Sequence, residues 1–169
     1  MGHWITRLFK HRRFDEGDAQ RLLGTGAVQR VQARVAASET AHSGEIRVCV
    51  EAGLPWSYLR RSATPRERAV AMFGKLRVWD TEHNNGVLIY LLIAEHAIEI
   101  VADRGLARHV ADAAWQRITA TMKAEFQRGE FEAGLNQAVD AVDALLREHF
   151  ALAPGEANPN ELPDAPDLR

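Results

Sequence analysis

The sequence has a single cysteine, Cys49, so it forms no internal disulfide. Its longest apolar run, residues 87–94, has eight residues, whereas a membrane-spanning helix needs roughly 20. The basic start of the chain lacks the apolar stretch and the small-residue cleavage site of a secretory signal. These absences exclude a disulfide-stapled secreted domain and a membrane span, and we expect a cytoplasmic protein.

Several catalytic motifs are also absent. No two histidines have the i, i+4 spacing of a helical zinc site, and there is neither a GxSxG motif nor a GxxxxGK[ST] loop. Cys49 lies between two valines in a strand-like pattern, which indicates a buried, inert thiol. We therefore expect no nucleotide cofactor and no conventional nucleophile.

The formal net charge of -2 hides two charged ends. Residues 1–13 contain four arginines and lysines and no carboxylate, and the pattern around Trp4 and Phe9 predicts a basic amphipathic helix. This segment either packs on its own domain or lies on an anionic membrane. The tail after residue 150 is rich in proline and acids and poor in apolar residues, which predicts disorder. The chain thus divides into segment 1–14, domain 15–150 and tail 151–169.

Hydrophobic periodicity within the domain predicts alternating helices and strands. Helical spacing precedes residue 43, a short alternating strand covers 46–50, and Thr64 with Glu67 forms a capping box for the next helix. The continuous apolar run 87–94 is typical of a strand covered on both faces, and it should pair antiparallel with 97–102. Apolar residues then step by four over 106–126, which predicts the buried stripe of one long helix, and a last helix covers 131–146. We expect an α/β fold, a three-layer α/β/α sandwich with a small mixed sheet and helices on both faces.

Three sequence stretches carry a resemblance to a known family. They are NGVLIYLL at 85–92, IEIVADRGL at 98–106 and FQRGEFEAGL at 126–135. In this order they resemble the TPM domain family, which includes a thylakoid acid phosphatase domain of photosystem II repair. The resemblance implies a sandwich fold, binding of calcium or another divalent cation in some members, and weak acid phosphatase activity.

Polar residues gather at one predicted edge of the sheet. If strand 46–50 runs parallel to the central strand, Glu45, Asp80, Asn84 and Asp103 lie near that edge together with Asn85. Carboxylate and amide oxygens suit calcium or magnesium, so these residues are our candidate metal ligands. Alternatively, the two asparagines only make a turn and Asp103 only caps the next helix. An anion could also bind at that helix start beside Arg104.

A basic stretch at 54–78, with a local charge of +5, interleaves arginines with Trp56 and Tyr58. It could attract the phosphates of nucleic acid or lipid, but such stretches are usually solvated helix faces. No nucleic-acid-binding signature accompanies it, so we do not expect nucleic acid as a partner.

The leading hypothesis is a module that binds a divalent cation or a protein partner, with weak phosphatase activity as a secondary property. A metal-dependent phosphomonoesterase and a membrane-surface adaptor acting through residues 1–13 are the alternatives.

Overall fold

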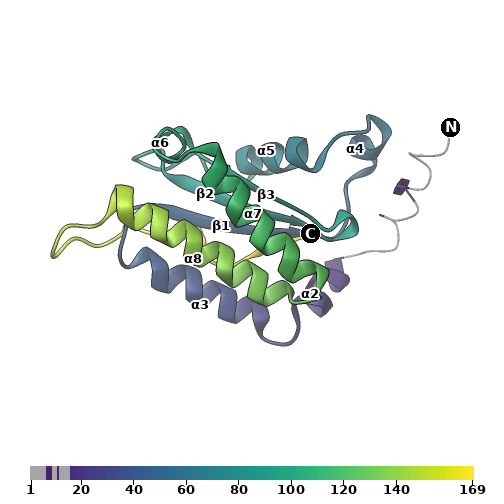
Figure 1. Ribbon diagram of the computed structural model, residues 1–169, viewed down its shortest axis with the longest axis horizontal. Helices are drawn as coiled ribbons and strands as arrows, with labels where there is room; N and C mark the ends of the chain where they lie inside the picture. The colour runs from purple at the N-terminus through teal and green to yellow at the C-terminus, as the bar shows by residue number, and fades with distance from the viewer. Residues whose placement is uncertain (1–6, 9–10, 12–15) are drawn as a thin grey trace.

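The computed structural model describes residues 7, 8, 11 and 16–169 (Figure 1). The elements in chain order are α2 (Glu16–Leu23), α3 (Ala27–Glu39), β1 (Glu45–Glu51), α4 (Trp56–Arg60), α5 (Pro65–Lys75), β2 (Gly86–Leu92), the 3-10 turn η1 (Ile93–Glu95), β3 (Ala97–Ala102), α6 (Arg104–Ala107), α7 (Asp112–Gln127), α8 (Phe131–Phe150) and β4 (Asp167–Leu168). Within the described part of the chain, no helix combines the length and apolarity required to cross a bilayer.

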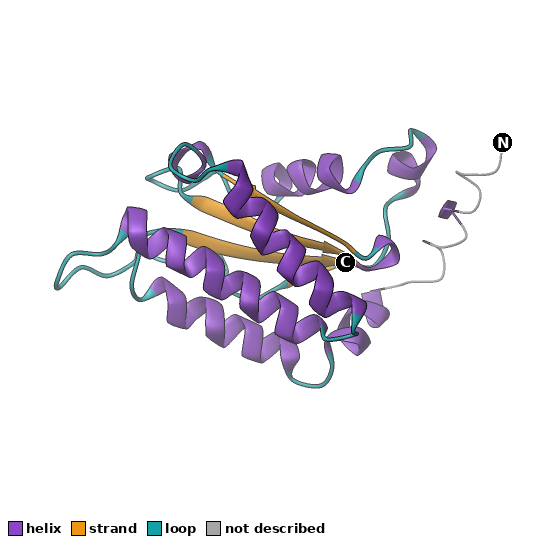
Figure 2. Cartoon of the chain, viewed as in Figure 1, coloured by secondary structure: helices purple, strands orange, loops and turns teal. Residues whose placement is uncertain are grey.

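The four strands form one mixed sheet in the order β3-β2-β1-β4 (Figure 2). β1 and β2 are parallel, with Glu45 opposite Gly86 and Glu51 opposite Leu92. β2 and β3 are antiparallel, which confirms the predicted hairpin. A parallel pair needs a crossover connection, and α4 and α5 lie in the segment that joins β1 to β2.

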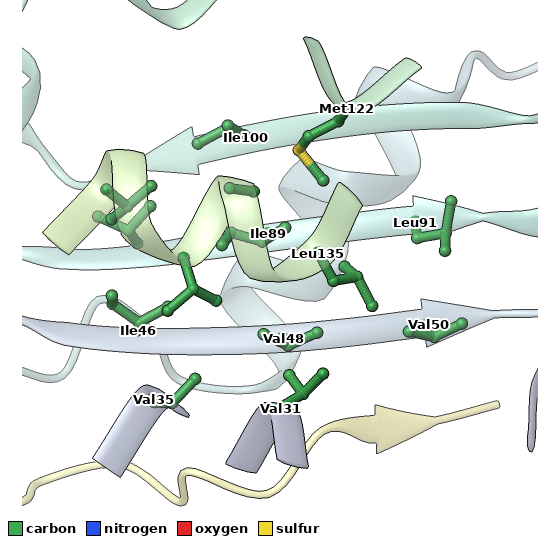
Figure 3. Packing of buried hydrophobic residues seen from close by; sticks show 14 of the residues in the cluster. Val31, Val35, Ile46, Val48, Val50, Ile89, Leu91, Ile100, Met122 and Leu135 are labelled. Atoms are coloured by element: carbon green, nitrogen blue, oxygen red, sulfur yellow. The ribbon is translucent and has the colours of Figure 1, made fainter. Parts of the chain in front are cut away.

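Alternate residues of the inner strands face one helical layer. Val48 of β1 and Ile89 of β2 pack in a cluster with Val31 of α3 and Leu135 of α8, as Figure 3 shows. Met122 of α7 completes this side of the core. The apolar residues that step by four over 106–126 therefore belong to this core, which confirms their predicted burial.

The other face of the sheet carries a second core. Leu88 and Tyr90 of β2 pack there with Met72 of α5 and Leu59 of α4. All seven residues of β2 are buried, because helices contact both of its faces. The mixed sheet with helices on both sides confirms the predicted α/β fold.

Two local predictions have different outcomes. The capping box is present, since Thr64 accepts from the Glu67 N–H and the Glu67 carboxylate accepts from the Thr64 N–H. The single helix expected over 106–126 is wrong, because Ala111 is extended (φ -65°, ψ 146°) and separates α6 from α7. Leu106 and Val110 still belong to the core, so a four-residue period marks the core-facing positions without requiring a continuous helix.

The C-terminal tail, predicted to be disordered, instead lies along β1. Figure 3 shows β4 beside β1 and pointing in the same direction, and Arg169 N donates to Val50 O (2.9 Å). Arg47 of β1 donates to the carbonyls of Pro163 and Ala165, and Leu162 is buried in the second core. The tail has few apolar side chains, but the polar side chains of β1 satisfy its backbone, which composition alone does not reveal.

Most of the predicted N-terminal segment lies outside the described residues. Arg7 and His11 within it contact the carboxylate of Glu95, at 2.5 and 2.8 Å. Burial opposes ionisation of Glu95, but the hydrogen bonds from His11 and Arg7 lower its pKa to about 2. The described part of the segment therefore packs on the domain.

Candidate functional site

The polar edge of the sheet is where β1 and β2 begin and β3 ends. Glu45 and Gly86 are opposite each other, and Asp103 N donates to Gly86 O (2.8 Å). Glu45, Gly86 and Asp103 therefore form a row across three neighbouring strands. Residues opposite each other in a sheet project toward the same face, so both carboxylates start from the same face.

The glycine in the middle of this row separates its two carboxylates. A Cβ on Gly86 would lie 2.0 Å from the carbonyl oxygen of Val78, a fully buried residue. The chain at Val78 thus occupies the space directly above Gly86. Glu45 and Asp103 share an edge but have another segment of backbone between them.

Asn84 and Asp103 are brought close through the backbone. Gly105 N donates to Asn84 O (2.8 Å), and a Cβ on Gly105 would lie only 2.3 Å from that same oxygen. The start of α6 can approach the loop this closely because position 105 is glycine. Asn84 itself has a φ of 52°, in the left-handed region that asparagine tolerates.

Only one of the two carboxylate oxygens of Asp103 takes part in capping α6. Its Oδ1 accepts from Arg104 N (2.7 Å), so it caps α6 as the alternative interpretation predicted. Its Oδ2 is buried and has no hydrogen-bond partner in the described part of the chain. The same holds for Oδ1 of the neighbouring buried Asn85, whose amide nitrogen donates to Ser43 Oγ (3.2 Å). Two unsatisfied oxygens therefore lie on adjacent loops.

Glu45 and Asp80 have other partners. Glu45 is fully buried, and its Oε2 accepts from Leu162 N (3.1 Å) in the tail, whereas its Oε1, like Asp103 Oδ2, has no hydrogen-bond partner among the described residues. Burial raises its pKa, although backbone N–H groups at Glu161 and Leu162 oppose the shift. Asp80 lies on the surface in an ion pair with Arg77 (2.5 Å). Across residues 7, 8, 11 and 16–169, no group of three or more His, Cys, Asp or Glu side chains is arranged to hold a metal.

A cleft of about 790 Å³ opens at this edge. The loop residues Glu82, His83 and Asn84 line it together with Arg108. Arg108 Nε donates to Gly105 O (3.3 Å), which ties its guanidinium to the start of α6. The tail from Ala151 to Pro159 forms the opposite wall. The polar edge is therefore a walled depression with carboxylate, amide and guanidinium groups.

The polar groups buried under β1 were not predicted from the sequence. Arg68 of α5 holds Glu51 through two hydrogen bonds (2.8 and 2.6 Å), and Tyr90 OH donates to the same carboxylate (2.5 Å). Burial raises the pKa of Tyr90, and the nearby Glu51 carboxylate adds to the shift. Alternation of charged and apolar residues, as in β1, is common in strands with one solvent-exposed face, but the structure buries all seven residues of β1. No signal in the sequence distinguishes these two cases.

The mixed sheet, the hydrophobic cores on its two faces and the loop-lined edge define a small α/β domain of sandwich type. A comparison with family models makes the assignment specific: the model described as "TPM domain" matches residues 17–145. The chain belongs to the TPM domain family. No curated protein matches it.

Solved structures of other proteins share this fold. The BA42 protein from the psychrophilic bacterium Bizionia argentinensis is 25% identical, with a TM-score of 0.72 over 83% of this chain and 91% of that one. The N-terminal domain of a P. gingivalis protein is 21% identical, with a TM-score of 0.62 over 85% of this chain and 96% of that one. The second likeness concerns the fold alone.

Proposed function

We propose that this TPM domain binds a divalent cation, calcium or magnesium, at the polar edge of its sheet. The observation that supports the proposal is Asp103 Oδ2, a buried carboxylate oxygen without a hydrogen-bond partner among the described residues. Leaving such a group unsatisfied is costly, and a cation would remove that cost. Family resemblance points the same way, since some members bind divalent cations.

The donor set fits a hard cation in part. Asp103, Asn84 and Asn85 supply carboxylate and amide oxygens from adjacent loops, and calcium and magnesium take such ligands together with water. Of the other predicted ligands, Glu45 has one oxygen bound to the tail and is separated from Asp103 by the backbone at Val78, and Asp80 is paired with Arg77. We therefore centre the proposed site on Asp103 and Asn84.

Thermal unfolding in calcium, magnesium or EDTA tests the proposal. A ligand that binds only the native state stabilises it by about 2.7 kcal/mol at 100 times its Kd, so millimolar cation should raise the Tm by several degrees. Asp103→Asn should abolish this increase while keeping the helix cap, because asparagine caps as well as aspartate. Asp80→Asn is the matched control and should respond like the unmodified chain.

Two results would reject the site. The first is a Tm that stays constant across millimolar calcium and magnesium. The second is an equal cation response in Asp103→Asn, which would place any cation elsewhere.

If cation binding occurs without turnover, the domain acts as an interaction module for a protein partner. A cytoplasmic location, expected from the sequence, is part of the same proposal.

A phosphomonoesterase is the second candidate function. It is favoured by Arg108, a cationic side chain that lines the same cleft as Asn84 and is suited to a phosphoryl oxygen. A cation bound there would supply polarisation of the phosphoryl group. Hydrolysis of p-nitrophenyl phosphate with and without magnesium or calcium tests this. A rate no higher than that of Asp103→Asn and Arg108→Gln would reject the enzyme hypothesis.

A further inference from the structure

Exposed apolar side chains concentrate on one helical layer. In the described part of the chain, the exposed large hydrophobic residues are Leu22, Trp56, Val70 and Trp79. Trp56 begins α4, Val70 lies in the middle of α5, and Trp79 follows α5, so three of the four lie over the second core. About half of each of these three residues is exposed (54%, 50% and 49%). Scattered exposed apolar residues need no explanation, but a concentration of them indicates a contact surface.

Two of these side chains lie along α5. Trp79 Nε1 donates to Gly74 O (3.4 Å), which lays the indole ring against the last turn of the helix. Val70 is one turn before Gly74 and therefore on the same side of the helix. Gly74 adds no side chain, and a Cβ there would meet no atom within 4 Å. Val70 and Trp79 thus lie on either side of an open position at Gly74, and we call these three residues the α5 strip.

Cationic side chains surround the α5 strip. Residues 56–80 contain six arginines and lysines and two carboxylates. Arg68 is buried against Glu51, but the other five are exposed (Arg60, Arg61, Arg66, Lys75 and Arg77). Three of these form surface ion pairs: Arg61 with Glu67 (3.5 Å) and Arg77 with Asp80 within the layer, and Arg66 with Glu99 of β3 (3.6 Å). Such pairs contribute little and exchange partners readily, so the layer retains a net positive charge.

The opposite layer has the opposite charge. α8 carries four carboxylates and one arginine (Glu132, Asp140, Asp143, Glu148 and Arg147). Figure 1 shows α8 and α3 well separated from α4 and α5, with the strands between them. The molecule is therefore polarised across its sheet. Near a negatively charged plane, α4 and α5 would be turned toward it and α8 away from it.

We propose that the surface of α4 and α5 docks on an anionic lipid bilayer. Exposed cations of this layer such as Lys75 would contact lipid headgroups, while Val70 and the indole of Trp79 enter the interfacial region, where tryptophan is favoured. The position of Val70 favours lipid over nucleic acid. An aliphatic side chain in the centre of the surface gains from an apolar layer but offers no ring on which a base stacks.

Sedimentation of the full chain with vesicles tests this proposal. Vesicles of phosphatidylcholine with 30% phosphatidylserine should carry the protein down, and pure phosphatidylcholine should not. Lys75→Glu should weaken the partition coefficient at least about fivefold, since one basic residue near such a surface contributes about that factor. Lys123→Glu makes the same charge change at an exposed position of α7, on the other side of the sheet, and should have no such effect.

A second matched pair tests the apolar contact. Val70→Ser should reduce binding about threefold or more through the lost transfer of its side chain. Leu22→Ser, an exposed aliphatic residue on α2, should leave binding unchanged. The proposal is overturned by an absence of binding to anionic vesicles, or by equal losses within either pair. It is also overturned if deletion of residues 1–13 abolishes binding that Lys75→Glu and Val70→Ser leave intact. Binding of a single-stranded oligonucleotide in place of vesicles would overturn it too, and would favour a nucleic-acid surface.

Discussion

Glu39, at the end of α3, has a carboxyl group that the fold holds in its neutral form. The residue is only 4% exposed, and its Oε1 accepts from Ile46 N (2.8 Å) on β1. Burial is the main cause that raises its pKa to about 9, and the carboxylates of Glu45 and Asp164 add to the shift. The native state therefore binds a proton that the unfolded chain releases above its ordinary pKa of 4.5.

The sign of the pH dependence follows directly. Because the pKa of Glu39 is higher in the folded state, its contribution to stability is fully present below pH 4.5 and is lost as pH rises toward 9. Each unit of pKa difference corresponds to about 1.4 kcal/mol. At pH 7 the group should therefore lower the free energy of unfolding by about 3 kcal/mol relative to acidic pH.

The substitution Glu39→Gln removes this dependence. The amide oxygen of glutamine can still accept from Ile46 N, and glutamine has the shape of the neutral acid. The variant should match the unmodified chain at pH 4.5 and exceed it by about 3 kcal/mol at pH 7.

Urea unfolding of the unmodified chain and of Glu39→Gln, at pH 4.5 and at pH 7, measures this difference in the free energy of unfolding. Glu148→Gln, at an exposed carboxylate of α8, controls for the substitution itself and should change little at either pH. If Glu39→Gln destabilises the protein at pH 7, or shifts stability equally at both pH values, the Glu39 carboxyl is ionised in the native state and the reasoning is wrong.

Two further predictions concern the second core and the tail. Arg68→Met should cost about 3 to 5 kcal/mol in urea unfolding, because it leaves Glu51 buried without its cation; adding Glu51→Gln should recover part of the loss, and no recovery would contradict the role of the charge. Leu162→Ala should cost about 2 to 3 kcal/mol if the tail is docked, since Leu162 is 7% exposed in the second core. A cost near zero for Leu162→Ala would mean that the tail leaves the sheet in solution.

Much of the fold could be predicted because the signals are local or periodic. The capping box at Thr64 depends on residues three positions apart, and it forms as predicted. The continuous apolar run in β2 indicated burial on both faces, and the short connection after it indicated the antiparallel pair with β3. Such patterns depend on residues that are close together in the sequence, so they can be recognised without the tertiary structure.

The candidate site was harder to predict. Whether side chains at one edge of a sheet converge depends on which distant segments of backbone lie between them. The sequence placed Glu45, Asn84 and Asp103 at one edge, and the register agrees that β1 and β2 begin there and β3 ends there. It could not show that Val78 lies over Gly86 or that Asp80 turns to Arg77. Whether these residues bind a cation stays a prediction until the Tm is measured.

By itself, the sequence determined that Cys49 stands alone, that no apolar run is long enough to span a bilayer, and that the order of helices and strands is that of an α/β domain. Only the tertiary structure decided what lies against β1. There, polar side chains that a pattern assigns to solvent instead bind the tail and α5, since Arg47 donates to tail carbonyls and Glu51 accepts from Arg68. A hydropathy pattern records how polar a side chain is, whereas its burial depends on whether a distant segment supplies the matching hydrogen bonds.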